Sequence, residues 1–162
     1  ANDALLDSYQ PERAPNLRAT IDMAIMMGKM VCTTSKWGAF LRDIKFKLAR
    51  VLGKLPDGPP EYPPLSTGVI LAGSAGAGRY FPQVVADDGR RMDDQIGSDH
   101  CIVSRDDMAN AELAPFAEPL RRWFDSHATE AVLIRPDRYV FGTGDVDQLR
   151  DAWRVATGLR SI

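Results

Sequence analysis

The fold is decided by residues 131–142, which read AVLIRPDRYVFG. Four apolar residues lead into Arg135-Pro136-Asp137, and a second apolar run follows. Proline has the φ angle that the second position of a type I turn requires, and aspartate is accepted at the third position. The stretch therefore predicts a β-hairpin whose first strand, an unbroken apolar run, is central to a sheet.

A helix signal follows the hairpin directly. Asp145 can cap a helix, and Gln148 can bond back to the N–H of the cap residue. Gly158 ends the helix, whose apolar face is formed by Val146, Leu149, Trp153 and Ala156. A thioredoxin-like domain ends with a hairpin and a helix, as do other α+β folds. We therefore predict an α+β fold, with a thioredoxin-like domain built from a mixed sheet and flanking helices.

Shorter signals complete this domain, which we place at residues 69–162. Asp87-Asp88-Gly89 is a hairpin turn. Pro119 is expected to begin the regular part of a helix, with Pro115 in a preceding turn. The remaining strands are predicted at residues 69–72, 83–86, 91–96 and 101–104.

Residues 1–55 predict a helical arm, and residues 56–68 a stiff connector that holds five of the eleven prolines. The arm is expected to contain three helices: residues 3–10, ending near Pro11, then Pro15 to Val31, and a third helix between caps at 33–35 and Gly53.

Two faces of this arm suggest contacts. The second helix is crowded by Met23, Met26, Met27 and Met30, which form either an adaptable docking surface or ordinary packing. Our hypothesis is that this helix rests on a domain that is missing from the sequence. The third helix carries a basic face, which is typical of a solvated surface and also of a helix that meets an anionic membrane or an acidic partner. Its cations are Lys36, Arg42, Lys45, Lys47 and Arg50.

Candidate reactive groups are few. Residues 73–78, GSAGAG, lack the Lys-Ser/Thr of a phosphate loop and the spacing of a dinucleotide loop, so they predict a turn. Asp99, His100 and Cys101 are neighbours on a strand and cannot converge on one metal ion. Asp93 and Asp94 are expected to cap a helix or pair locally. We predict no catalytic, cofactor-binding or metal site.

The motif that remains is Arg135-Pro136-Asp137, to which we assign a structural role. Arg135 could instead bind an anion, because the guanidinium fork matches a carboxylate. Cys101 and His127 would form a nucleophile pair only if the fold brought them together.

Three stretches carry a resemblance to a known family: LLDSYQPER at residues 5–13, GRYFPQ at residues 78–83, and LIRPD at residues 133–137 before an aromatic strand. In this order, they resemble three parts of FAD-dependent aromatic-ring hydroxylases of the 3-(3-hydroxyphenyl)propionate hydroxylase type: the segment that closes the flavin-and-substrate region, the entry to the C-terminal domain, and the end of the enzyme. The resemblance thus places the helical arm, residues 1–55, at the end of the flavin-and-substrate region. One departure is Arg138, where the family usually has glycine. A type I turn needs no positive φ there, so we expect the hairpin to form.

This resemblance implies that the chain is a fragment of an FAD- and NAD(P)H-dependent monooxygenase that hydroxylates phenolic aromatic acids. The fragment itself would bind no cofactor, and would serve domain support or subunit association. Its expected partners are the rest of the parent and a second copy, as a cytoplasmic dimer. A net charge of −2 gives no argument for nucleic acid, and no apolar run is long enough for a membrane span.

Two alternatives remain open. The chain could be a free-standing thioredoxin-like binding module, without redox activity because it has no Cys-x-x-Cys pair. It could also be a Cys101-dependent enzyme, which would require a thiolate of lowered pKa.

Overall fold

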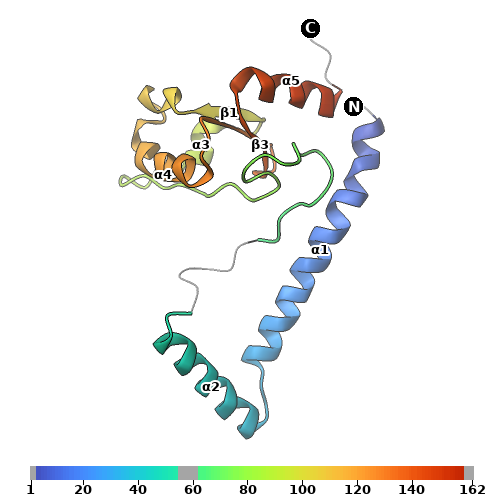
Figure 1. Cartoon of the computed structure of the whole chain (residues 1–162), viewed down its shortest axis with the longest axis vertical. Coiled ribbons are helices and arrows are strands. Elements are labelled where there is room, and N and C mark those ends of the chain that lie inside the picture. Colours follow the sequence, from blue (N-terminus) through green and yellow to red (C-terminus); the bar gives the residue numbers. More distant parts are fainter. Residues whose placement is uncertain (1–2, 55–61, 159–162) are drawn as a thin grey trace. The chain divides into compact units, whose positions relative to one another are not determined.

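The computed structural model describes residues 3–54 and 62–158 (Figure 1). The chain divides into two compact units: Ala1–Pro15 together with Pro64–Ile162, and Asn16–Pro63. The first residues of the sequence thus belong to the same unit as its last hundred. The domain boundaries at residues 56–68 stay a prediction, and much of that connector lies outside the described residues.

Helix α1 spans Asp3–Val31 and includes Pro11 and Pro15, so the predicted end of a helix near Pro11 is wrong. Pro15 has no N–H to donate to the carbonyl of Pro11, four residues earlier, which normally weakens a helix. Here the hydroxyl of Thr67 donates to the Pro11 carbonyl over 3.2 Å. A contact from a distant part of the chain replaces the missing helix bond, and the helix continues.

Helix α2 spans Lys36–Val51, as its cap signals predict. The Ser35 hydroxyl accepts a hydrogen bond from the N–H of Gly38 over 3.3 Å. At the other end, Gly53 has a φ of +62°, and its N–H donates to the Arg50 carbonyl over 3.2 Å. Glycine takes this left-handed conformation without a steric cost and ends the helix.

The larger unit contains a three-stranded sheet in the order β1-β2-β3, formed by Cys101–Ser104, Ala131–Ile134 and Val140–Gly144. These are the predicted hairpin and one of the predicted short strands, and they confirm the α+β class. Both pairings are antiparallel, so the three described strands do not form the mixed sheet that we expected. The thioredoxin-like assignment stays a prediction.

Helices cover both faces of this sheet, and β2 is buried along its whole length. Alternate side chains of a strand point to opposite faces. Helix α4, Ala117–His127, contributes Phe124 to the core on one face, and helix α5, Val146–Thr157, contributes Leu149 to the core on the other (Figure 1). This arrangement explains why β2 is an unbroken apolar run rather than an alternating one.

The segments before β1 differ from their predicted strands. Residues 69–72 form no regular strand, although the N–H of Leu71 donates to the Phe141 carbonyl of β3 over 2.7 Å. The turn at residues 87–89 is confirmed by the hydrogen bond from Ala86 N–H to the Arg90 carbonyl, 2.9 Å long. The predicted strand at 91–96 is instead helix α3, Met92–Ile96.

Two 3₁₀ helices separate β1 from α4. The first, η1, spans Asp106–Ala109, and the second, η2, spans Ala114–Phe116 and contains Pro115. Pro119 lies in the first turn of α4, where its missing N–H has no partner to lose. The predicted placement of the two prolines is therefore confirmed.

The turn of the β2–β3 hairpin needs a positive φ at Arg138, contrary to our expectation, because φ is +68° there. Arg138 N–H donates to the Arg135 carbonyl and Arg135 N–H to the Tyr139 carbonyl, both over 2.9 Å, as in a type I turn closed by a left-handed residue. The glycine usual in the family fits this conformation. Arg138 offsets the strain by donating to the Gly97 carbonyl over 2.6 Å and pairing with Asp93 at 3.4 Å.

Helix α4 ends in a second left-handed residue, Ala128, with a φ of +48°. The left-handed conformation costs an alanine about 1–2 kcal/mol, and glycine relieves this strain. Glycine also gives the unfolded chain more conformational freedom, which cancels part of the gain. We therefore expect Ala128→Gly to stabilise the chain by about 1 kcal/mol. Urea unfolding measures the change. Ala117→Gly, in the same helix without positive φ, should destabilise the chain, and a loss of stability in Ala128→Gly would contradict the prediction.

Candidate functional site

The strongest concentration of buried charge surrounds Arg135, at the end of β2. Arg135 is only 8% exposed, and its partner Glu12, on α1, is 3% exposed. The guanidinium donates two parallel hydrogen bonds to the Glu12 carboxylate, of 2.7 Å to Oε1 and 3.0 Å to Oε2. A buried carboxylate is thus paired by the residue type that fits it best, in the two-bond geometry that is strongest.

The remaining donors of Arg135 are also used. Its Nε donates to Asp137 Oδ1 over 3.0 Å and its Nη2 to Asp137 Oδ2 over 2.9 Å. The second Nη1 hydrogen bond goes to the Val69 carbonyl over 2.8 Å. Arginine has five N–H donors. All five are therefore paired within the chain, so the fork is filled and is not available for an external anion.

Arg13 completes the group of charges around Arg135. Arg13 forms an ion pair with Asp137, and its guanidinium carbon lies 5.4 Å from the centre of the Tyr139 ring. Glu12, Arg13, Arg135 and Asp137 form a group of two acids and two bases, which we call the ion-pair network. Opposite charges balance inside it, as buried charges require.

Burial alone would lower the pKa of Arg135, because it disfavours the charged form. The hydrogen bonds and charges of Glu12 and Asp137 outweigh burial and raise the pKa of Arg135 above its usual value. The partners of Arg135 therefore favour its charged form.

Gly68 makes room for this network. Its φ is +98°, and a Cβ atom at this position would lie 2.1 Å from Oε2 of Glu12. The same Oε2 accepts a hydrogen bond of 2.8 Å from the N–H of Val69. The backbone at residues 68–69 thus lies directly against the carboxylate, which is possible only without a side chain at residue 68.

The sequence indicated part of this arrangement. Arg135 and Asp137 were recognised as a motif, whereas Glu12 and Gly68 were not assigned a role. The available signal was the stretch at residues 5–13, in which Glu12 and Arg13 follow a proline. No local sequence pattern indicates that this stretch contacts the hairpin.

The glycine-rich loop at residues 73–78 is a turn, as predicted. The N–H groups of Ser74 and Gly78 donate to the carbonyls of Leu71 and Val140. Thr143 of β3 donates its hydroxyl to the Ala75 carbonyl over 2.8 Å. The amides of Ser74 and Gly78 are therefore used within the fold.

The predicted separation of His100 and Cys101 is confirmed. His100 stacks on Trp153 of the core on the α5 face, with ring centres 4.9 Å apart, whereas Cys101 packs against the core on the α4 face. His127 stacks on Trp123 at 4.2 Å. Asp93 and Asp94 lie in the first turn of α3, and Asp93 pairs with the distant Arg138. Within residues 3–54 and 62–158, no three metal-ligating side chains form a group.

Cys101 does not have the lowered pKa that a thiol-dependent enzyme requires. Burial raises the pKa of its thiol to about 11. Its thiolate fraction at neutral pH is consequently small. A raised pKa is the opposite of what the hypothesis of a Cys101-dependent enzyme requires, and the reactivity of the thiol tests that hypothesis.

We expect Cys101 to react with iodoacetamide more slowly than the exposed Cys32 at pH 8, followed by peptide mass spectrometry. In urea the two rates should become equal. The raised pKa also makes folding less favourable as pH rises from about 9 to about 11, because the thiol of the unfolded chain ionises first, at its ordinary pKa of 9.0. Equal rates in the folded chain would contradict the burial of Cys101.

Comparison with known proteins extends these observations. A model of the HcaD C-terminal domain matches residues 116–157, which cover α4, the hairpin and α5. The "Probable NADH-specific resorcinol 4-hydroxylase" of Rhodococcus jostii is 31% identical over 172 residues, covering 86% of this chain and 32% of that protein. The 3-(3-hydroxy-phenyl)propionate/3-hydroxycinnamic acid hydroxylase of Burkholderia cenocepacia is 30% identical over 191 residues, covering 87% and 35%.

A solved structure shows the same fold. The OxyS anhydrotetracycline hydroxylase from Streptomyces rimosus aligns with 99% of this chain and 37% of its own, with a TM-score of 0.52 and 22% identity. The chain spans about a third of the length of the curated relatives that it matches. Among the described residues, no helix has the length and apolarity needed to cross a bilayer. By its sequence, this chain corresponds to the C-terminal region of the aromatic-ring hydroxylases.

Proposed function

We propose that this chain is the C-terminal part of an FAD- and NAD(P)H-dependent monooxygenase that hydroxylates phenolic aromatic acids. The observation that carries the proposal is the meeting of the three family-like stretches at one hairpin. Residues 5–13 reach it through the pair between Glu12 and Arg135. Residues 133–137 form one side of the hairpin and its turn.

The second stretch, residues 78–83, reaches the same hairpin. Phe81 N–H donates to the Arg138 carbonyl and Val140 N–H to the Arg79 carbonyl, both over 2.8 Å. The rings of Tyr80 and Tyr139 meet edge to face with centres 5.5 Å apart. Three stretches far apart in the sequence thus share one packing arrangement, and this favours common descent over three chance matches.

The part played by this chain is structural. FAD and NAD(P)H would be bound by the preceding part of the parent, and Arg135, Pro136 and Asp137 would hold the hairpin rather than touch a substrate. This role is supported by the filled fork of Arg135 and by the amides of Ser74 and Gly78 in the glycine-rich loop, which are used within the fold. In this role, the chain would support the main domain of the parent or join the subunits of a cytoplasmic dimer.

The test compares the parent protein, expressed from its whole reading frame, with the 162-residue chain. We expect the parent to show flavin absorbance and to oxidise NADH or NADPH faster when 3-(3-hydroxyphenyl)propionate or resorcinol is added. We expect the 162-residue chain to be colourless. A yellow 162-residue chain would contradict its non-catalytic role, and a start codon directly before Ala1 would favour a free-standing module instead.

A further inference from the structure

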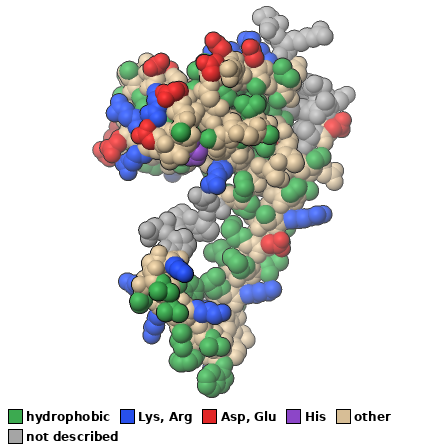
Figure 2. Space-filling view, in the orientation of Figure 1, with side chains coloured by type: hydrophobic (Ala, Val, Ile, Leu, Met, Phe, Trp, Pro, Cys, Tyr) green, Lys and Arg blue, Asp and Glu red, His purple; other side chains and the backbone are tan. Residues whose placement is uncertain are grey.

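The unit formed by residues 16–63 leaves its apolar side chains uncovered. Helix α2 contains no buried residue, and Trp37 and Val51 on it are 77% and 82% exposed. Figure 2 shows hydrophobic side chains over α2 and over the part of α1 that belongs to this unit. An apolar surface of this extent on a folded protein marks an interaction site.

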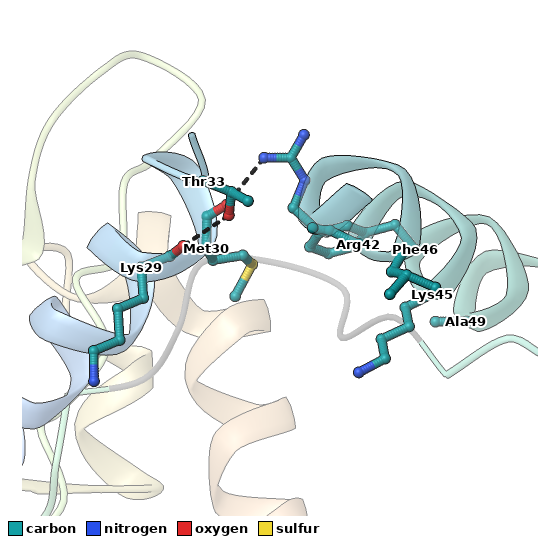
Figure 3. Close-up of a pocket in the computed structure, with 9 residues that line it drawn as sticks. Lys29, Met30, Thr33, Arg42, Lys45, Phe46 and Ala49 are labelled. Atoms are coloured by element: carbon teal, nitrogen blue, oxygen red, sulfur yellow. Dashed lines mark hydrogen bonds between the residues drawn. The ribbon is translucent and has the colours of Figure 1, made fainter. Parts of the chain in front are cut away.

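Part of this apolar surface lines a groove between the end of α1 and α2. Its volume is about 610 Å³, and Met30, Leu41 and Phe46 are among its apolar lining residues. Figure 3 shows that Met30 of α1 points toward α2. Arg42 links the two helices at this groove by donating to the Met30 carbonyl over 3.0 Å.

The groove is lined by positive charge as well. Lys29, Arg42 and Lys45 are the charged residues among its lining. Residues 16–54 contain eight Lys and Arg against two Asp and Glu, whereas the whole chain has an acidic excess of two. A second copy placed across a twofold axis would set these cations against one another. An occupant with acidic residues beside an apolar face fits better.

We propose that the groove receives an acidic, amphipathic segment from the part of the parent hydroxylase that precedes this chain. This inference rests on the proposed function, in which the chain is part of a longer hydroxylase. The relatives extend over about three times the matched length, so a parent of that size could supply such a segment. Apolar side chains of the segment would fill the groove beside Met30 and Phe46. Its carboxylates would pair with Lys29 and Lys45. The proposed dimer would then use another surface.

The test places a photo-crosslinking residue, p-benzoylphenylalanine, at Phe46 in the full-length parent. Phe46 is 41% exposed, so the substitution leaves the fold intact. We expect an intramolecular crosslink to an acidic segment that precedes Ala1, identified by mass spectrometry. Lys29→Glu and Lys45→Glu together should lower its yield about tenfold, because they reverse charge around the groove and keep the bond between Arg42 and Met30.

The matched control is Lys47→Glu with Lys54→Glu, which makes the same change of charge nearby on residues that do not line the groove. Its crosslink yield should stay within about twofold of the parent. A crosslink between two copies, a crosslink to lipid in phosphatidylserine vesicles, or an equal loss in both double variants would overturn the inference. Flavin absorbance and NADH oxidation are measured on the same samples: a parent that is active without the crosslink refutes only the groove assignment, whereas a parent without flavin refutes the proposed function.

Discussion

Replacing Arg135 by alanine is expected to lower the free energy of unfolding by about 3–5 kcal/mol, because it leaves the buried carboxylate of Glu12 without its charged partner. Asp137 would keep Arg13 but lose both bonds from Arg135. Urea unfolding, followed by circular dichroism, measures the effect. Arg135→Lys should lose less than alanine, since it keeps the charge but not the fork.

The control for this experiment is Arg122→Ala, which removes an exposed ion pair of 3.0 Å with Glu118 on α4. Exposed pairs of this kind contribute about 0.5 kcal/mol or less. If Arg135→Ala cost no more than Arg122→Ala, water would have to reach the carboxylate of Glu12, and the network would not be buried as described.

The second large effect is expected for Gly78→Ala. A Cβ atom at this position would lie 2.1 Å from the backbone oxygen of Leu65, and φ is +75°. The Leu65 carbonyl cannot turn away freely, since the N–H of Leu65 is bonded to the Gly78 carbonyl over 2.7 Å. Adding the left-handed strain of about 1–2 kcal/mol to an overpacking cost of about 1–3 kcal/mol gives a loss of about 2–5 kcal/mol.

Gly73→Ala is the matched control, because Gly73 has a φ of +87° in the same loop and nothing within 4 Å of its added Cβ atom. It isolates the conformational strain, about 1–2 kcal/mol, from the clash. Thermal and urea unfolding of both variants give the difference. Equal losses for Gly73→Ala and Gly78→Ala would show that the contact with Leu65 relaxes without cost.

Turn and cap signals in the sequence correctly predicted the elements that a few neighbouring residues determine. The hairpin around Pro136 and the helix capped by Asp145 follow from turn and cap preferences, which act over a few residues. Asp145 does accept hydrogen bonds from the N–H groups of Asp147 and Gln148, over 3.0 and 3.1 Å.

The errors have two sources: contacts with distant residues, and segments too short for their periodicity to be read. The break expected near Pro11 was avoided because Thr67 donates to its carbonyl, and no rule about neighbouring residues contains that contact. The strand expected at residues 91–96 was a short segment, for which apolar periodicity does not distinguish a helix from a strand. At Arg138, contacts with Gly97 and Asp93 accompany a backbone conformation that arginine alone disfavours.

The candidate site divides in the same way. Arg135 and Asp137 are two residues apart and were visible as a motif. Glu12 lies 123 positions from Arg135, and its sequence surroundings carry no sign of burial. In the sequence, only the family-like stretches connected the two regions. In the structure, the pair between Glu12 and Arg135 connects them.

The pairing of Glu12 with Arg135 has a consequence for how the protein is made. A ribosome adds about 5–20 residues per second, so the 123 positions between them correspond to about 6–25 s of synthesis. During that time, Glu12 has left the ribosome while its partner does not yet exist, and a charged carboxylate in water has no reason to become buried. The first turns of α1 therefore reach their final place only after β2 and its turn have been synthesised. Folding of this unit thus depends on residues made early and residues made late.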